Sequence, residues 1–249
     1  MDGSTVLERL RALPAGARLL DAVDGLSGVH LVGGAVRDLA LGLVPPRDLD
    51  LVAEEDGPAV ARELASRLAA PAPVVHGRFG TADLPGAGVN VATARAESYE
   101  RPGALPSVRA GSVADDMARR DFTVNAIAVG VSPDRLGVVH AADFAFDDLR
   151  DRRLRVLHEQ SFVDDPTRLV RLARYAARLG FAVEEGTRGL AQAAFSWDAP
   201  ATAGRARMGS ELLLALREPD PVAALVVLRG LAGDVVLDPG LEVDEGLLR

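Results

Sequence analysis

The chain has 249 residues, of which 48% are hydrophobic, so it can bury a sizeable core and form one large domain or two smaller ones. It has no Cys and only 4 His, which excludes a disulfide framework, a thiolate zinc site and a cysteine nucleophile. The formal net charge of −8 argues against a surface coated in basic groups for non-specific nucleic-acid binding. Any metal should be held by carboxylates.

No segment approaches the roughly 20 consecutive apolar residues needed to span a bilayer, and the N-terminus has an acid where a signal peptide has basic residues. We therefore expect a cytoplasmic protein with no membrane partner. Every basic residue is Arg, and the charges are uneven: residues 150–180 carry eight Arg against four acids, whereas residues 211–249 carry eight acids against three Arg. A polyanion should bind the middle of the chain rather than its end.

The first part of the chain mixes short strands with helices. The apolar run Val29–Val32 predicts a buried strand, and Gly33-Gly34 ends it before a helix over Ala35–Leu41, which Gly42 stops. Further along, the pattern predicts a turn at Pro45-Pro46, a helix over Pro58–Ala69, a mobile loop over Glu97–Ser112, and strands at Asp48–Val52, Val74–His76, Thr81–Leu84, Val89–Ala94 and Ile127–Val131.

From about residue 153 the pattern becomes 3.6-periodic and rich in Leu, Ala and Arg. This indicates an α/β or α+β part over residues 1–150, followed by a helical part over residues 151–249. Asp165 followed by Pro166 predicts a helix N-cap with proline at the first helical position, and Arg168 falls close enough to pair with Asp165.

Asp48 and Asp50 are candidates for a metal site. Residues i and i+2 of a strand project from the same face, so the two carboxylates lie side by side while Leu49 and Leu51 point into the core. Their repulsion is relieved when a hard divalent cation such as Mg²⁺ bridges them. On spacing alone, a solvated strand end with two acids explains the pattern equally well.

Gly33-Gly34 lies between a buried strand and a helix start, where backbone N–H groups can approach a phosphate. Arg37, one helical turn further on, can add a charge-assisted contact to the same anion. The alternative is a tight turn with Arg37 and Asp38 on a solvated face. A phosphate cradle and a carboxylate pair this close together favour a nucleoside triphosphate with Mg²⁺.

Four ordered motifs carry a resemblance to a known family. Leu31-Val-Gly-Gly-Ala-Val-Arg-Asp38 followed by Arg47-Asp-Leu-Asp-Leu51 resembles the signature of the class II tRNA nucleotidyltransferase and bacterial poly(A) polymerase family. Arg119-Arg-Asp-Phe-Thr-Val-Asn-Ala126 resembles its R-R-D-x-x-x-N-A motif, and Asp164-Asp-Pro-Thr-Arg168 its E-D-x-x-R motif. The resemblance, over about residues 29–217, implies a polymerase-β-like nucleotidyltransferase head, a mixed sheet with helices, followed by an all-helical neck and body.

The resemblance also implies roles for individual residues. Asp48 and Asp50 would be catalytic and would ligate two Mg²⁺ ions. The other implied groups are Gly33, Gly34, Arg37 and Asp38 on the triphosphate, Arg120, Asp121 and Asn125 along the ribose and phosphates, Asp165, Arg168 and Arg171 as base-selecting residues, and Arg205, Arg207 and Glu211 as supporting residues, mainly through salt bridges.

The activity implied is template-independent addition of C and A to the tRNA 3′ end from CTP and ATP, with no DNA partner expected. Sequence alone leaves open an A-only or CC-only adding enzyme, a poly(A) polymerase of the same family, and a catalytically silent nucleotide- or RNA-binding relative. The chain departs from the family at Asn90, where relatives often carry an acid and where an amide cannot supply a third negative charge. Family members usually continue beyond the point where this chain stops.

Overall fold

The computed structural model describes residues 2–43, 48–77 and 80–232, so the predicted Pro45-Pro46 turn, Arg47 and residues 233–249 of the acidic C-terminal segment lie outside the described residues. The chain forms two compact units. The first comprises Met1–Glu97 and Val108–Leu149, and the second comprises Ser98–Ser107 and the chain from Arg150 onward. Residues 98–107 thus belong to the second unit, although the predicted boundary assigned them to the first domain.

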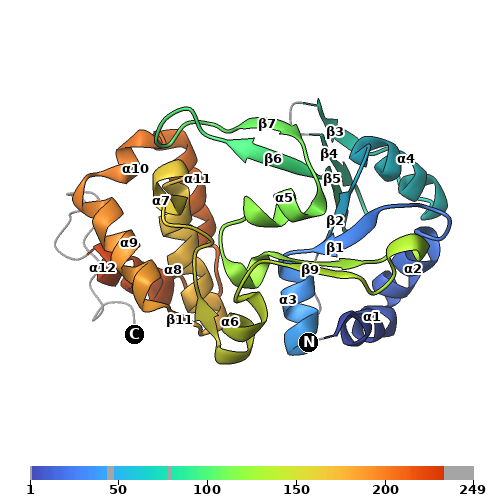
Figure 1. Ribbon diagram of the computed structural model, residues 1–249, viewed down its shortest axis with the longest axis horizontal. Helices are drawn as coiled ribbons and strands as arrows, with labels where there is room; N and C mark the ends of the chain where they lie inside the picture. Colours follow the sequence, from blue (N-terminus) through green and yellow to red (C-terminus); the bar gives the residue numbers. More distant parts are fainter. Residues whose placement is uncertain (1, 44–47, 78–79, 233–249) are drawn as a thin grey trace. The chain divides into compact units, whose positions relative to one another are not determined.

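A mixed seven-stranded sheet forms the centre of the first unit, with the strand order β3-β4-β5-β2-β1-β8-β9 (Figure 1). β2 and β5 pair in parallel, whereas every other neighbouring pair in this sheet is antiparallel. The strands are β1 (Val29–Val32), β2 (Leu49–Ala53), β3 (Val74–His76), β4 (Thr81–Leu84), β5 (Val89–Thr93), β8 (Ile127–Gly130) and β9 (Val139–Ala141).

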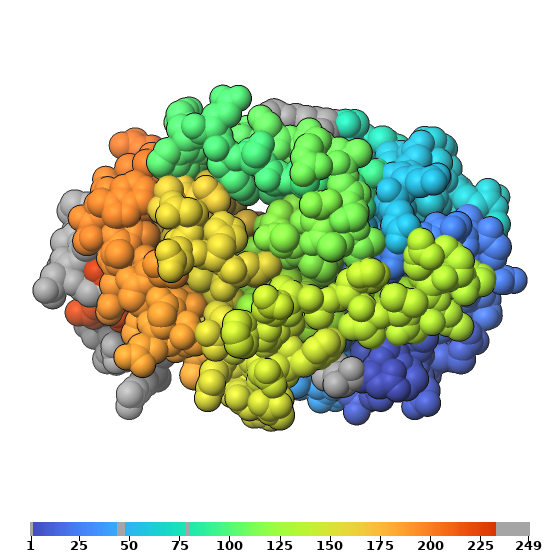
Figure 2. All heavy atoms as spheres, in the orientation of Figure 1, coloured from blue at the N-terminus to red at the C-terminus, as the bar shows by residue number. Residues whose placement is uncertain are grey.

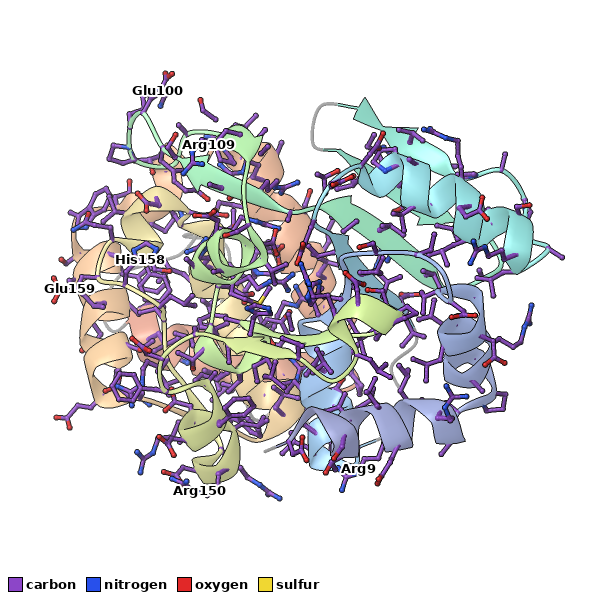
Figure 3. The ribbon with its side chains drawn as sticks, turned by 45° about the vertical axis from the view of Figure 1, so that its right-hand side comes forward. Arg9, Glu100, Arg109, Arg150, His158 and Glu159 are labelled. Atoms are coloured by element: carbon purple, nitrogen blue, oxygen red, sulfur yellow. The ribbon has the colours of Figure 1, made fainter. Side chains whose placement is uncertain are left out.

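Helices pack against this sheet and against one another. They are α1 (Gly3–Ala12), α2 (Pro14–Ala22), α3 (Gly34–Leu41), α4 (Gly57–Arg67), α5 (Val113–Ala118), α6 (Ala145–Asp151) and the 3₁₀ turns η2 (Thr123–Asn125) and η3 (Pro133–Arg135). α3 contacts β1, β2 and β8, α4 contacts β2, β4 and β5, and α2 contacts α4, so that α2 and α4 share one continuous surface (Figure 2). Arg9 of α1 donates to the carbonyls of Leu39 and Ala40 at the end of α3 (Figure 3).

The alternation along β2 separates the core from the other face of the sheet. Leu49 and Leu51 are 3% and 1% exposed, whereas Asp50 between them is exposed. Because directly paired residues of neighbouring strands share a face, Asn90 of β5 lies on the same face as Asp50. The sheet therefore presents polar side chains on the side opposite its leucine-rich core.

Most of the predicted elements are present within a residue or two. Gly42 ends α3 in the left-handed conformation, as its position predicted. The loop prediction for Glu97–Ser112 is wrong in part, because β6 (Arg95–Ser98) and β7 (Ser107–Ala110) pair as a two-stranded sheet. All four β7 residues are exposed, so this strand lacks the apolar alternation that identifies strands in a sequence.

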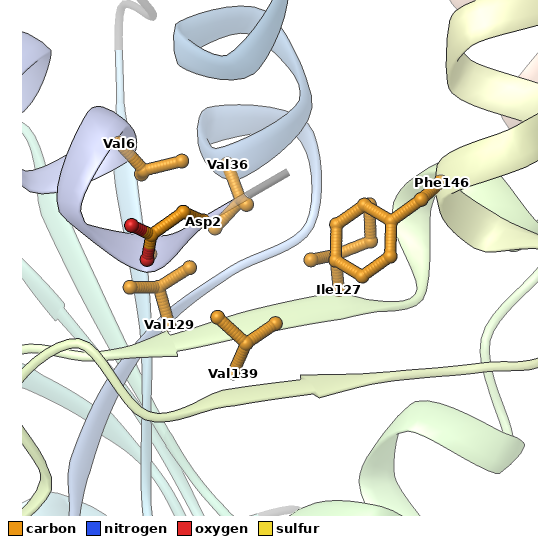
Figure 4. Close-up of a pocket in the computed structure, with 8 residues that line it drawn as sticks. Asp2, Val6, Val36, Ile127, Val129, Val139 and Phe146 are labelled. Carbon is orange, nitrogen blue, oxygen red and sulfur yellow. The ribbon is translucent and has the colours of Figure 1, made fainter.

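A small hollow lies between α1, α3 and the β8–β9 hairpin (Figure 4). Its lining is mainly apolar and consists of Asp2, Gly3, Val6, Val36, Ile127, Val129, Val139 and Phe146. The one carboxylate, that of Asp2, accepts a hydrogen bond from the Ser4 backbone N–H and caps α1. This hollow is therefore a packing boundary between helices and sheet and offers no converging polar groups for a ligand.

The second unit is mainly helical. Its elements are β10 (Arg153–Leu154), α7 (Ser161–Asp164), α8 (Thr167–Leu179), β11 (Ala182–Val183), α9 (Glu185–Ser196), α10 (Ala199–Thr202), α11 (Arg205–Leu216) and α12 (Pro221–Ala232). α8 contacts α7, α11, α12 and the short parallel pair β10–β11. Leu169 and Leu172 of α8 are fully buried, and Gly180 ends the helix with a φ of 64°.

The predicted fold class, α+β with a mixed-sheet head followed by a helical part, is confirmed; the two-residue strands β10 and β11 are an addition to the expected all-helical part. Within the described ranges, no helix is both long enough and apolar enough to cross a membrane.

His30 in β1 makes the folded state sensitive to pH. The ring is fully buried, and neither of its nitrogens has a hydrogen-bond partner in the described structure. Burial disfavours the charged ring and holds the pKa of His30 below its ordinary value of 6.5. In the unfolded chain this histidine takes up a proton near pH 6.5, whereas in the folded chain it remains neutral to a lower pH. The free energy of unfolding therefore falls as the pH drops from 7.5 towards 5.5.

We expect His30→Leu to reduce this pH dependence, as measured by urea unfolding at several pH values between 7.5 and 5.5, and to leave the part that comes from His158, whose pKa burial also lowers. The control His76→Gln changes a half-exposed histidine and should retain the slope of the parent chain. An unchanged slope in His30→Leu would show that other groups set the pH dependence.

Candidate active site

The turn between β1 and α3 is built on Gly33. Its φ of 68° and ψ of −132° lie in a region that residues with a side chain rarely occupy. The Gly33 N–H donates to the Ile127 carbonyl at 3.0 Å, which ties the turn to β8. A methyl group at position 33 would lie 2.6 Å from Nη1 of Arg120, so the missing side chain allows a guanidinium to lie directly over the turn.

Beneath this turn, predicted site residues form one hydrogen-bonded chain. The Arg37 guanidinium is 2% exposed; it donates to Asp38 at 2.7–2.8 Å and to Asn125 Oδ1 at 2.5 Å. The Asn125 amide in turn donates to Asp121 Oδ1 at 3.0 Å. The structure thus brings Arg37, Asp38, Asp121 and Asn125 together, with Arg37 holding the Asn125 side chain. The predicted contacts of these residues with a nucleotide stay predictions.

Asp50 lies in β2, and its carboxylate accepts a hydrogen bond from the Asn90 amide at 3.0 Å. Although the Asp50 side chain is exposed, neighbouring protein groups displace part of its hydration and raise its pKa, and the charges of Asp48 and Asp83 act in the same direction. The Asn90 hydrogen bond and the positive charge of Arg120 oppose this rise. Arg120 therefore lies within electrostatic range of Asp50, which connects the glycine turn to the carboxylates.

Asp48 is exposed and directly precedes β2, so the strand begins one residue later than predicted. Within the described residues no group of three or more His, Asp or Glu side chains forms a metal cage. Two carboxylates nevertheless form a hard oxygen donor set that suits Mg²⁺, which usually keeps water and substrate phosphates as its other ligands. The residues present therefore fit the implied metal.

Sequence reasoning missed Asp116, a buried acid of α5 whose carboxylate pairs with both Arg119 and Arg120. The spacing offered a signal, because an acid three and four residues before two arginines is the pattern of helical ion pairs. The amide of Asn90 was noticed only as a missing charge, whereas the structure shows it as a donor to Asp50.

In the second unit, the prediction for Asp165 needs correction. The residue preceding α8 is Pro166, and Asp165 lies one position further out, where its side chain accepts from Thr167 N at 3.1 Å. Its ion pair is with Arg207 of α11 at 2.8 Å and not with Arg168. Arg168 instead donates to Ser161 Oγ at 2.7 Å. Arg207, 42 residues further along the chain, thus pairs with Asp165 in place of the predicted partner Arg168.

The other predicted residues of this unit lie along α8 and α11. Glu211 accepts from Arg171 at 3.3 Å and from Arg174 at 2.6 Å, which joins the two helices. Arg207 also donates to the Gly103 carbonyl at 2.8 Å. Arg205 begins α11 and is exposed, and the described structure gives it no ion pair. The proposed functional roles of all these residues stay predictions.

We expect Gly33→Ala to lower the free energy of unfolding by about 1–3 kcal/mol, because alanine would be strained at this φ and would collide with Arg120. Urea unfolding measures the change. The control Gly209→Ala lies inside α11 with open space around the new methyl group and should be neutral or stabilising by about 0.5–1 kcal/mol. Equal effects of the two substitutions would contradict the described turn.

Comparison with known proteins gives a consistent result. Residues 29–155 match the family described as poly A polymerase head domain. An A-adding tRNA nucleotidyltransferase of Geobacter sulfurreducens is 40% identical over 220 residues, which cover 85% of this chain and 25% of the relative. A CC-adding tRNA nucleotidyltransferase of Deinococcus radiodurans is 42% identical over 230 residues, which cover 87% of this chain and 57% of the relative. The chain thus spans about a quarter to just over a half of these relatives.

Solved structures agree with this match. A CCA-adding enzyme in an apo form superposes with a TM-score of 0.82 at 32% identity, covering 93% of this chain and 56% of the other. A tRNA nucleotidyltransferase complexed with a primer tRNA and an incoming ATP analogue has a TM-score of 0.75 at 34% identity, covering 88% and 62%. The chain therefore belongs to the class II tRNA nucleotidyltransferase and bacterial poly(A) polymerase family.

Proposed function

We propose that this chain catalyses template-independent transfer of C and A nucleotides from CTP and ATP to the 3′ end of tRNA. One observation carries the proposal: Arg120 lies over the Gly33 turn, and the antiparallel register of β1 and β2, with Leu31 opposite Leu51, puts that turn beside Asp48 and Asp50. An anion-binding corner and a carboxylate pair therefore share one site, as transfer from a nucleoside triphosphate requires.

In this reaction the primer 3′-hydroxyl attacks the α-phosphorus, the new P–O bond forms, and pyrophosphate leaves with the electrons of the broken bond. The α3 N-terminus at Gly34 and the Arg120 guanidinium would bind the triphosphate. Arg37, held by Asp38, would keep Asn125 in place beside the ribose. The chain's contribution is thus positioning and charge, without a covalent intermediate.

Asp48 and Asp50 would hold Mg²⁺, which when bound neutralises triphosphate charge and lowers the pKa of the attacking hydroxyl. Asn90 would keep the Asp50 carboxylate oriented through its hydrogen bond. The proposal includes two metal ions, as the resemblance implies.

We assign base selection to residues of the second unit. Asp165, Arg168 and Arg171 lie at or near the start of α8. Asp165 is an acceptor and is held by Arg207. The two arginines are donors; Arg168 is held by Ser161 and Arg171 by Glu211. Cytosine and adenine both carry an exocyclic amine beside a ring nitrogen, so one acceptor and one donor can serve either base. This supports the use of CTP and ATP. The proposal includes the cytoplasm as the place where the chain acts on tRNA.

A second candidate is a partial enzyme that adds only A or only CC. The observation in its favour is that the A-adding and CC-adding relatives are 40–42% identical to this chain, whereas the CCA-adding enzymes it matches are 30–36% identical to it.

The test uses three tRNA transcripts that end at the discriminator base, at C and at CC, each incubated with Mg²⁺ and with CTP and ATP singly and together. Sequencing of the 3′ ends should show ordered growth to CCA from all three transcripts. Growth from CC ends alone would indicate an A-adding enzyme, and growth from the other two ends that stops at CC would indicate a CC-adding enzyme. Binding of nucleotide without growth would indicate the silent relative.

We expect Asp48→Asn and Asp50→Asn each to reduce turnover by more than about a hundredfold, since loss of outer partners of a metal site alone costs about 10–100-fold. Asp21→Asn, at an exposed acid of α2, provides the control and should retain turnover. Turnover preserved in both Asp48→Asn and Asp50→Asn would contradict the assignment of these residues.

A further inference from the structure

The Asp116 carboxylate has no part in the reaction as described above. It is fully buried, although a buried charge is costly unless it is paired. Its Oδ1 accepts from Arg119 Nε at 2.9 Å and Nη2 at 2.6 Å. Its Oδ2 accepts from Arg120 Nε at 3.3 Å and Nη2 at 3.0 Å. One carboxylate thus holds two guanidinium groups, one on each oxygen.

The two arginines differ in their surroundings. Arg119 also donates to Glu97 Oε1 at 3.2 Å, and Glu97 accepts from Arg95 at 2.9 Å. Within the described residues, Arg120 forms an ion pair with Asp116 only, whereas Arg119 shares Asp116 and also pairs with Glu97. Asp116 is therefore the acid that holds Arg120 beside the Gly33 turn.

Two hydrogen-bond donors of Arg120 are not used in the described structure. A guanidinium has five N–H groups, and here two bind Asp116 and one on Nη1 binds the Asn125 carbonyl at 3.4 Å. The part of the chain that the structure describes offers no acceptor for the remaining two, one on each Nη. They belong to the guanidinium that lies over Gly33, whose Nη1 is 2.6 Å from the place that a side chain at position 33 would take.

We propose that Asp116 is a positioning residue for the nucleotide: it fixes the Arg120 guanidinium over the Gly33 turn so that the two remaining N–H groups donate to phosphate oxygens. The inference rests on the proposed function, because it assigns a bound triphosphate to this turn. A pre-oriented fork binds more tightly than a mobile one, since less side-chain freedom is lost on binding. Asp116 thus acts on the nucleotide only through Arg120.

The test compares Asp116→Asn with Glu97→Gln. Each variant replaces a buried carboxylate that contacts Arg119 with its amide, but only Asp116 contacts Arg120. Calorimetric titration with CTP and ATP in the presence of Mg²⁺ gives the dissociation constants, and thermal unfolding identifies a temperature at which every variant is folded. We expect Asp116→Asn to raise Kd at least tenfold and Glu97→Gln to leave it within twofold of the parent value. Equal effects would overturn the proposal.

A second comparison separates positioning from general loss of stability. In an Arg120→Ala background, Asp116→Asn should change Kd less than twofold, because the group through which it acts is absent. Additive effects of the two substitutions would show that Asp116 acts by another route. The KM for the nucleotide should rise with Kd, while kcat changes much less.

If Asp116→Asn does not fold, Asp116→Glu tests the same link, because glutamate keeps the charge but its longer side chain moves the carboxylate away from the place where it holds the Arg120 guanidinium. A tenfold rise in Kd supports the proposal, and a Kd within twofold of the parent value overturns it. Measurements on the parent protein separate a failure of the proposed function from a failure of the proposed role of Asp116. Failure of the parent to bind or transfer a nucleotide contradicts the proposed function, whereas normal transfer with an unaffected Asp116→Asn contradicts only the role of Asp116.

Discussion

The approach of the Arg120 guanidinium to Gly33 is the contact on which the candidate site depends. It requires a residue without a side chain, in a backbone conformation that glycine tolerates, at the end of a fully buried strand. It also requires a counter-charge behind the guanidinium, which Asp116 supplies. With both conditions met, a positive group stands at the N-terminus of α3, where the helix dipole already favours an anion.

Pairing of enclosed arginines with acids also reduces the positive charge of the arginine-rich segment of the second unit. The arginine-rich segment that forms α8 faces acids of the segment that follows it: Arg174 is 8% exposed and pairs with Glu211 at 2.6 Å and Glu218 at 3.2 Å. Much of the basic excess is thus neutralised within the second unit. Counting arginines therefore overstates the charge left for a polyanion.

Sequence reasoning succeeded where the determinants are local. Paired glycines between an apolar run and a helix predict the β1–α3 turn, and alternation around Asp50 predicts which side of β2 is buried. It failed where a distant residue decides. Asp165 and Arg168 are near neighbours, yet Arg207 from another helix takes the acid, because packing of α11 against α8 brings a guanidinium to it.

The burial of Arg37 is a second case of this kind. An arginine one turn into a helix looks like a surface residue, and only the position of Asn125 beside α3 shows that the guanidinium is enclosed. The exposed strand β7 shows the same limit for secondary structure, since its backbone pairing with β6 leaves no apolar pattern in the sequence. Long-range contacts, rather than residue type, decided each of these features.

The most direct test of the account is a crystal structure of the protein with Mg²⁺ and a non-hydrolysable ATP analogue. The account predicts triphosphate oxygens within hydrogen-bonding distance of the Arg120 guanidinium and the Gly34 backbone N–H, with Mg²⁺ bound to the Asp48 and Asp50 carboxylates. A triphosphate bound away from the Gly33 turn, or a metal bound without either aspartate, would contradict it.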